Sequence, residues 1–204
     1  MANQKSSNMI DISETPNIWN RFFMIHSLVV IGSKEKGGDY NFAPKHMAMP
    51  LGFGDKFGFM GTPRKTTYRN ISREKAFTVS YPRPDQLIIS SMMASQREDD
   101  DTKPITKEVP TVNARHIEGQ FIKDSYFQLE CTLSEQLGKF GEWKIIVGEI
   151  AAAYVHKDAL RKEGEEINDA ELIKNHPLLA YVHPNRFSII EDSNAFPLPK
   201  NFKR

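Results

Sequence analysis

The chain lacks the features that would direct it to a membrane, an oxidising compartment or a nucleic acid. It has 204 residues and one cysteine, Cys131, so no intramolecular disulfide can form. No window approaches the ~20 apolar residues of a membrane-spanning helix, and no apolar core with a cleavage site opens the sequence. Lys and Arg number 27 against 26 for Asp and Glu, so no net field attracts a polyanion. We therefore expect a cytoplasmic protein that binds neither membranes nor nucleic acids.

The sequence also lacks the motifs of common metal and nucleotide sites. No cysteine and histidine spacing of the zinc type occurs, and the glycines form neither a Walker-type loop nor a dinucleotide-binding turn. The acidic run over residues 98–101 has no histidine or regularly spaced oxygen ligand beside it, so it predicts a solvated loop. His26 lies inside a strand pattern and is interpreted as a core or barrel residue in preference to a catalyst. We expect no metal site.

What the chain does contain is a series of apolar runs with the period of β-strands. The alternation is strict from Phe127 to Leu133, which predicts a strand with one face in water. Cys131 falls on the apolar face of that strand, so we interpret it as a buried and unreactive thiol. The predicted strands cover residues 23–31, 39–42, 57–61, 76–81, 127–137, 143–156, 178–182 and 187–190.

Glycines and prolines mark where these strands end or bend. Turns are predicted over residues 32–38 and 138–141. Gly148 and Glu149, in the middle of the strand over residues 143–156, predict a bulge or a close approach by a ligand or another chain. Residues 85–96 have helical spacing and predict a helix.

The stretch over residues 57–70 changes from a strand pattern to hydroxyl groups and cations. Residues after Pro63 have the spacing of a short helix, with Thr66 or Thr67 as its N-cap. A helix N-terminus offers unpaired N–H groups and a partial positive charge, which suit a phosphate group. The alternative is a capped helix in a surface turn that binds nothing.

Three motifs carry a resemblance to a known family. Asn41-Phe-Ala-Pro44 predicts an edge strand, a bulge or a loop, because a proline cannot donate to a central ladder. Gly61-Thr-Pro-Arg-Lys-Thr-Thr-Tyr-Arg-Asn-Ile71 follows the apolar strand, and Val147-Gly-Glu-Ile150 lies in a late strand. In this order and spacing they resemble the flavin reductase-like, FMN-binding split-barrel family. The resemblance implies a mainly β protein with short helices, an antiparallel split β-barrel of Greek-key type.

The resemblance also implies where a flavin binds. The Asn-x-Ala-Pro element lines the isoalloxazine ring, and the basic element holds the phosphate and ribityl chain. Thr66 replaces an acidic residue that is frequent in the family. His46 stands where the family often has a small serine, so it narrows the pocket above the ring or adds a proton donor; no other catalytic side chain is implied, since the flavin N5 carries the chemistry. The implied cofactor-binding residues are Asn41, Phe42, Ala43, Pro44, His46, Thr62, Arg64, Lys65, Thr66, Thr67 and Asn70.

The function implied is an FMN-binding oxidoreductase that passes electrons from NADH or NADPH through FMN to an acceptor. FAD is the alternative cofactor, since its pyrophosphate fits the same place. A flavoredoxin-like carrier without its own nicotinamide site and a non-catalytic flavin-binding protein are the alternative functions.

The resemblance and one strand predict how the chain is divided and assembled. The family's members are homodimers, and the apolar strand over residues 145–153 has more hydrophobic surface than a monomer edge should display. We therefore expect a homodimer that passes electrons to an acceptor protein or a small molecule. The chain divides into an N-terminal extension over residues 1–18, the barrel over residues 19–192 and a tail over residues 193–204.

Overall fold

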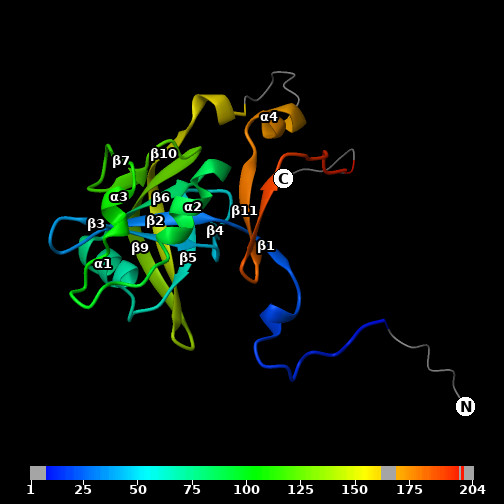
Figure 1. The fold of residues 1–204 in the computed structure, drawn as a ribbon, viewed down its shortest axis with the longest axis horizontal. Helices are drawn as coiled ribbons and strands as arrows, with labels where there is room; N and C mark the ends of the chain where they lie inside the picture. The colour runs from blue at the N-terminus through cyan, green and yellow to red at the C-terminus, as the bar shows by residue number, and fades with distance from the viewer. Residues whose placement is uncertain (1–7, 162–168, 198, 200–204) are drawn as a thin grey trace, which may run out of the picture.

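A curled antiparallel sheet of seven strands forms the body of the protein (Figure 1). The computed structural model describes residues 8–161, 169–197 and 199, and the rest of the predicted terminal segments lies outside this description. Every strand pairing in the large sheet is antiparallel, which confirms the predicted mainly β class. In sheet order the strands are β3 (Tyr40–Lys45), β2 (Val29–Lys34), β6 (Ala76–Tyr81), β9 (Phe127–Phe140), β10 (Trp143–Val155), β5 (Lys56–Gly61) and β4 (Ala48–Pro50).

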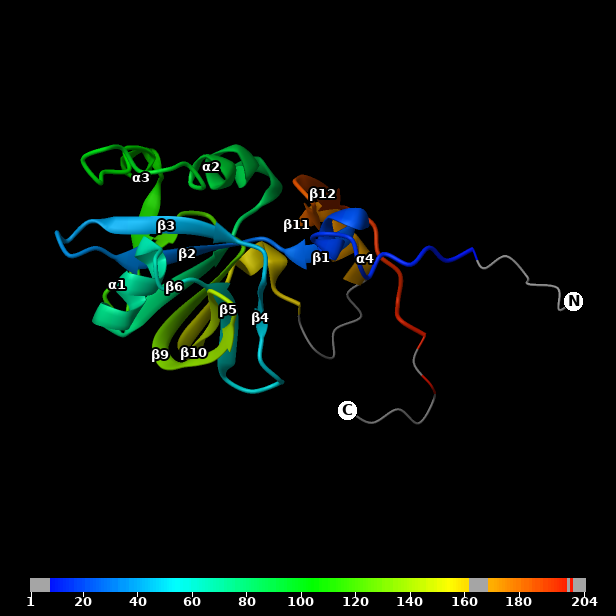
Figure 2. The ribbon, with the colours of Figure 1, turned by 90° about the horizontal axis from the view of Figure 1, so that it is seen from below.

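A second sheet of three strands stands beside the large sheet (Figure 2). The prediction of one strand over residues 23–31 is wrong, because the chain changes sheets at Leu28. The first piece pairs with β11 in the small sheet, whereas the second pairs with β3 and β6 in the large one. The small sheet consists of β1 (Met24–Ser27), β11 (Leu178–His183) and β12 (Arg186–Ile190).

Both predicted turns are shorter than expected. β2 extends to Lys34, through the first part of the turn predicted over residues 32–38, so the reversal begins at Glu35, whose N–H donates to the carbonyl of Asp39 at 2.7 Å. β9 likewise extends into residues 138–141. The hairpin turn after it therefore falls at positions 141 and 142.

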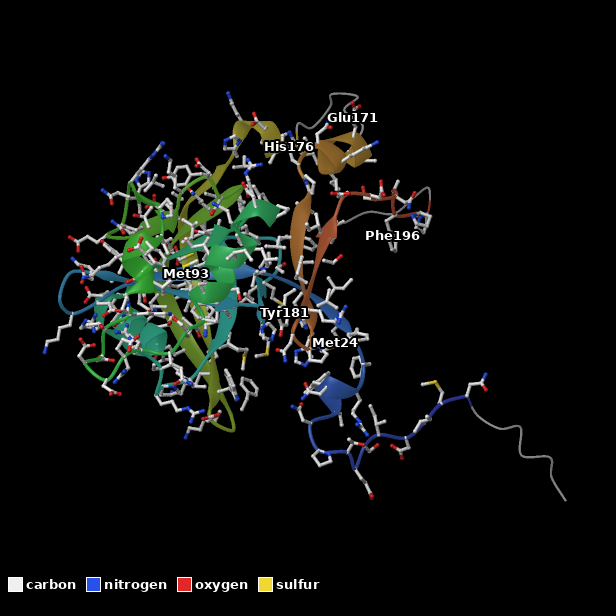
Figure 3. The ribbon with its side chains drawn as sticks, in the orientation of Figure 1. Met24, Met93, Glu171, His176, Tyr181 and Phe196 are labelled. Carbon is white, nitrogen blue, oxygen red and sulfur yellow. The ribbon has the colours of Figure 1, made fainter. Side chains whose placement is uncertain are left out.

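Short helices connect the strands. The helix predicted over residues 85–96 is cut to α2 (Leu87–Met92), which a 3₁₀ turn (Pro84–Gln86) precedes. Beyond it the carbonyl of Met93 accepts a hydrogen bond from the Lys103 ammonium, and the chain leaves as a loop. Met93 is buried in the middle of the body (Figure 3). The remaining elements are η1 (Ile18–Arg21), α1 (Thr66–Glu74), α3 (Ile105–Glu108), β7 (Thr111–Asn113), β8 (Gln120–Ile122), η3 (Lys157–Ala159) and α4 (Asp169–Asn175).

Aromatic side chains from the alternating strands form the core of the large sheet. Phe57 and Phe59 from β5 are buried with Phe77 from β6, and the Phe59 and Phe77 rings meet edge to face at 5.5 Å. Cys131 from β9 lies in the same cluster. Its burial, with the Glu130 charge next to it, raises the pKa of the thiol to about 12, which confirms a buried thiol with little thiolate character.

One polar residue departs from the predicted wet face of β9. Glu130 is buried, and its carboxylate accepts hydrogen bonds from the backbone N–H groups of Arg115, His116 and Ile117 at 2.8, 2.7 and 3.0 Å. The Tyr154 hydroxyl donates a fourth at 2.9 Å. Burial alone would raise the pKa of Glu130, but these donors hold it below its usual value. The predicted wet face is therefore wrong here, because the loop before β8 folds over the strand.

Strand β10 has a neighbour on each side. It pairs with both β9 and β5, and its register with β9 shifts between Val147 and Gly148, which confirms the predicted bulge. The prediction of an exposed apolar edge over residues 145–153 is wrong for residues 145–149, because β5 pairs with that part of β10 and Ile146 is fully buried. The buried part of this strand therefore offers no surface for a dimer.

Neither a membrane span nor a metal cluster occurs within the described residues. No helix there is long and apolar enough to cross a bilayer. No group of three or more His, Cys, Asp or Glu side chains in that part of the chain is placed to hold a metal ion. The acidic run over residues 98–101 is exposed, as predicted for a solvated loop.

The packing of Gly148 generates a stability prediction. A Cβ atom at this position would lie 2.4 Å from Phe77 Cζ and 2.9 Å from Cys131 Cβ. Overpacking of this kind costs ~1–3 kcal/mol, so we expect Gly148→Ala to lower the free energy of unfolding by that amount in urea titrations. Gly37→Ala is the control, because a Cβ there meets nothing within 4 Å. Equal stability of the two variants would contradict the close approach of β10 to Phe77.

Candidate cofactor-binding site

A cavity of about 590 Å³ opens between β3, the start of α1 and the loop after α2. Its volume lies within the roughly 300–1,000 Å³ of small-molecule sites. We call it the cationic cavity, because the charged side chains of its lining are mainly basic. The basic residues are Lys45, Arg64, Lys65, Arg69, Arg97 and Lys103.

Positive charge in this cavity exceeds the negative charge beside it. Asp101 is the one acidic residue among the described residues that line it. Arg64 pairs with Glu142 at 3.0 Å, but both side chains are exposed, and such pairs contribute little. The side chains of Lys45 and Lys65 make no ion pair or hydrogen bond with any described residue. An anion that enters the cavity therefore finds cations that no carboxylate neutralises.

Two of the lysines are buried deeply enough to change their pKa values. Lys103 Nζ donates to main-chain carbonyls, including that of Phe42 at 3.0 Å. Burial, with the charges of Arg97 and Lys45, lowers the pKa of Lys103 to about 8. Burial and the charge of Lys65 also lower the pKa of Lys45. A bound anion would stabilise the charged form of both lysines and raise these pKa values again.

The first turn of α1 borders the cavity. The prediction that Thr66 or Thr67 caps this helix is wrong: the N-cap is Lys65, and no described side chain bonds to the helix end. The N–H of Lys65 donates to the carbonyl of Thr62 at 3.0 Å, and this turn leads directly into the helix, which begins at Thr66. Because the first N–H groups of a helix have no intrahelical partner, the uncapped end keeps donors that suit an anion.

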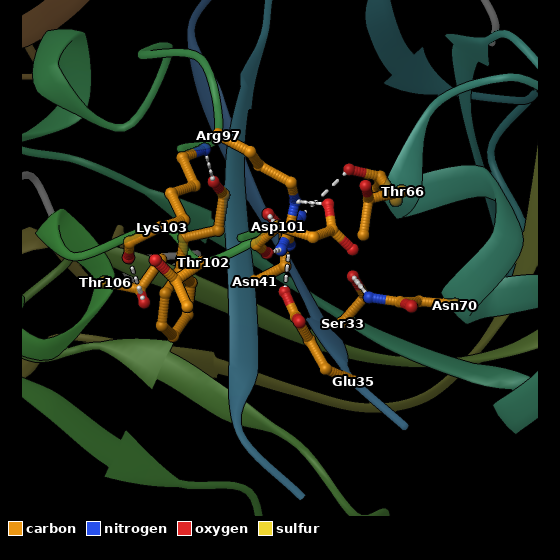
Figure 4. Close-up of polar contacts among 12 residues, drawn as sticks. Ser33, Glu35, Asn41, Thr66, Asn70, Arg97, Asp101, Thr102, Lys103 and Thr106 are labelled. Atoms are coloured by element: carbon orange, nitrogen blue, oxygen red, sulfur yellow. Dashed lines mark hydrogen bonds and ion pairs between the residues drawn. The ribbon is translucent and has the colours of Figure 1, made fainter. Parts of the chain in front are cut away.

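Asn41 joins the three walls of the cavity (Figure 4). Its amide nitrogen donates to Thr67 Oγ1 on α1 at 3.1 Å, and its amide oxygen accepts from Arg97 in the loop after α2 at 3.4 Å. Arg97 also pairs with Glu35 in the turn after β2. Asn41 is 3% exposed and Thr67 is 6% exposed. A buried polar network thus holds β3, α1 and the loop in one arrangement.

The structure brings most of the predicted cofactor residues together. Thr62 adds a buried hydroxyl, Oγ1, that has no hydrogen-bond partner among the described residues and that a ligand in the cavity would satisfy. Three of the predicted residues lie outside the cavity lining. Phe42 packs in the core, Asn70 donates to Ser33 Oγ at 3.2 Å, and His46 borders neighbouring pockets. The predicted residues that line the cavity are Asn41, Ala43, Pro44, Thr62, Arg64, Lys65, Thr66 and Thr67.

His46 lies where the large and small sheets meet. Its ring stacks on Tyr181 with a centroid distance of 4.4 Å and lies 5.5 Å from His26 and 5.9 Å from His183. Burial, helped by the two neighbouring histidines, lowers the pKa of His46 to about 4. The ring is therefore neutral at pH 7 and does not supply an imidazolium acid. His26 is only half-buried and belongs to the small sheet, which corrects its interpretation as a core or barrel residue.

Sequence reasoning missed several residues of the cavity. Lys45 directly follows the Asn-x-Ala-Pro element, and its position next to that element was the available signal. Arg69 lies on the predicted helix, and its guanidinium donates to Thr66 Oγ1 at 3.4 Å. Arg97 and Lys103 flank the acidic run, and nothing in the sequence places that loop against β3. Such loop contacts depend on the tertiary fold.

Comparison with protein families now identifies the chain. The sequence profile described as the flavin reductase like domain matches residues 21–186, a range that includes every residue lining the cationic cavity. The chain belongs to the flavin reductase-like family. This confirms the resemblance drawn from the three motifs and makes the protein a member of a family of flavin-binding oxidoreductases.

Solved structures share the fold of this flavin reductase-like protein. A Shewanella frigidimarina flavin reductase with a split barrel domain has a TM-score of 0.73 and 18% identity, covering 86% of this chain and 87% of its own. The 2-nitrobenzoate 2-nitroreductase of Pseudomonas fluorescens has a TM-score of 0.78 and 16% identity over 96% and 98%. Flavoredoxin from Methanosarcina acetivorans has a TM-score of 0.74 and 18% identity over 95% and 97%. These likenesses confirm the split-barrel fold. Comparison with curated protein sequences gives no match.

Proposed function

We propose that this protein binds FMN in the cationic cavity and passes electrons from NADH or NADPH through it to an acceptor. The observation that carries the proposal is the excess of positive charge at the uncapped start of α1. A phosphate monoester carries close to two negative charges at neutral pH, and a helix N-terminus with adjacent cations suits it. Lys45 and Lys65, which have no partner among the described residues, provide those cations.

Each wall of the cavity has a role in this proposal. Arg64, Lys65 and the first turn of α1 hold the phosphate, and Thr67 positions that turn through Asn41. Asn41, Ala43 and Pro44 belong to β3, an edge strand of the large sheet, and face the flavin ring from one side. The hydroxyl of Thr62 gains the hydrogen bond that it lacks. Thr66 also lines the site, and Phe42, His46 and Asn70 support it from its borders.

Bound there, FMN would supply a ring that accepts a hydride and releases electrons singly or in pairs. The protein's own task is to hold the phosphate, to keep the β3 side of the site in place and to leave room for a reductant. A small molecule or a second protein takes the electrons. Two solved neighbours illustrate these choices, because one is a 2-nitrobenzoate nitroreductase and the other is a flavoredoxin.

We propose that the protein acts as a homodimer in the cytoplasm. Ile25 on β1, Met49 on β4 and Phe53 in the loop after β4 are 70%, 60% and 98% exposed. Ile25 and Met49 border one pocket of about 420 Å³, so the exposed apolar side chains gather where the two sheets meet. A second copy that covers this surface would bury them.

Anaerobic reduction tests the proposed activity. We expect the protein to bind added FMN and the flavin absorbance near its long-wavelength maximum to bleach when NADH or NADPH is added without oxygen. A flavoredoxin-like carrier would bind FMN and bleach only with dithionite or a separate reductase. Failure to bind FMN would overturn the proposal. Failure to bind FAD as well would leave a protein that kept the barrel and lost the flavin.

The role of Lys65 gives a second prediction. We expect Lys65→Ala to raise the Kd for FMN about ten- to a hundredfold, because a charge-assisted hydrogen bond to phosphate is worth ~1.5–3 kcal/mol. Thr67→Val should cost less, near the ~1 kcal/mol of an ordinary hydrogen bond. The rate of bleaching at saturating FMN should barely change in either variant. Fluorescence titration of FMN measures the Kd values.

Lys36→Ala is the matched control, because Lys36 lies in the turn after β2 and lines none of the described pockets. It removes the same charge outside the cavity, so FMN affinity should stay unchanged. Lys65→Ala with normal FMN affinity, or with flavin retained but bleaching abolished, would refute the assignment of Lys65 to the phosphate.

A further inference from the structure

A second pocket, of about 420 Å³, adjoins the cationic cavity. We call it the aromatic pocket; its walls come from α2, the end of β3 and the β11–β12 hairpin. Pro44, Lys45 and Ala94 line both spaces, so the two are neighbours through these residues. A ligand in the aromatic pocket would therefore lie beside the proposed flavin.

Three rings give the pocket flat apolar walls. His46 and Tyr181 stack with an interplanar angle of 24°, and Phe187 lines the pocket from β12 (Figure 3 shows Tyr181). The Tyr181 hydroxyl is fixed by Asn185, whose N–H donates to it at 3.0 Å. The low pKa of His46 leaves its ring neutral at pH 7. Such walls favour a planar ligand, because aromatic rings prefer offset or edge-to-face contacts with one another.

The charge of the pocket favours an anion. Lys45 and Arg186 line it, and no described residue of its lining is an aspartate or a glutamate. Neither of the two cations makes an ion pair or a side-chain hydrogen bond with a described residue. Lys45 is largely buried, and burying an unpaired ammonium is costly, so an anion next to it would offset that cost.

Ser90 supplies an independent sign of a ligand. This α2 residue is fully buried in the pocket wall, and its Oγ has no hydrogen-bond partner among the described residues. Buried polar groups normally have a partner. An acceptor oxygen of a bound molecule would provide one.

We propose that the aromatic pocket binds a small planar anion, of the class of aromatic carboxylates, through Arg186, Lys45 and Ser90. That such a molecule serves as a substrate of the flavin rests on the proposed function, whereas its binding to the pocket does not. The shared wall at Lys45 couples the two sites, because an anion in one space offsets the charge of that ammonium and leaves less of it to attract an anion in the other.

Calorimetry with benzoate tests this inference. We expect benzoate to bind the full-length protein with a low-millimolar Kd, and to bind at least about tenfold more tightly than uncharged benzamide or non-planar cyclohexanecarboxylate. Arg186→Gln should weaken benzoate about tenfold. Ser90→Ala should weaken it about threefold without lowering the melting temperature, because the hydroxyl has no partner to lose. Arg21→Gln removes the same charge from η1, outside the pocket, and should bind benzoate normally.

Flavin affinity is measured in the same samples, and benzoate is titrated into both FMN-loaded and flavin-free protein. Benzoate binding to the flavin-free protein would support the pocket even if the proposed function failed. No binding of benzoate, equal binding by Arg186→Gln and Arg21→Gln, or displacement of FMN by benzoate would overturn the inference. Ser90→Ala with lower thermal stability and unchanged benzoate affinity would assign Ser90 to the fold alone and remove it from the site.

Discussion

The buried amide of Asn41 is the contact on which the site depends. It donates to Thr67 and accepts from Arg97, so one side chain fixes β3, α1 and the loop after α2 around a single cavity. Loops are usually the mobile part of a fold, but this one is tied to the strand through Arg97 and through Lys103, which donates to the carbonyl of Phe42. Arg97 and Lys103 are therefore held at a preformed space, and a ligand does not have to order these two side chains on binding.

The second constraint is electrostatic. Lys45 lies between the cationic cavity and the aromatic pocket, it is largely buried, and no carboxylate among the described residues pairs with it. Burying unpaired charge opposes folding, so this arrangement is easiest to understand as a site whose counter-charge comes from a ligand. The aromatic pocket beside Lys45 depends on the division into two sheets. The break at Leu28 sends β1 to the small sheet, and β11 then brings Tyr181 against His46 at the end of β3.

The sequence predicted what local patterns determine. Strand β5, with Phe57 and Phe59 inward, follows from alternation, and a short motif indicated the residues near the start of α1 that line the cationic cavity. The sequence did not predict the features that depend on contacts between residues far apart in the chain. Lys65, and neither threonine, became the N-cap, because a turn closed by Thr62 leads directly into the helix at Thr66. The alternating pattern predicts that Glu130 faces solvent. In the fold it is buried, because the loop before β8 supplies three N–H donors to its carboxylate. Arg97 and Lys103 carry no motif, and only the folded loop places them at the cavity.

The central claim is that the cationic cavity recognises the 5′-phosphate of a flavin. Titration of the same protein with FMN and with riboflavin tests it most directly, because the two ligands share the ring and the ribityl chain and differ only in the phosphate. We expect FMN to bind at least about tenfold more tightly, which corresponds to ~1.4 kcal/mol or more, and we expect raised salt to narrow the difference. Equal affinity for the two flavins would show that the lysines and the uncapped end of α1 do not bind a phosphate.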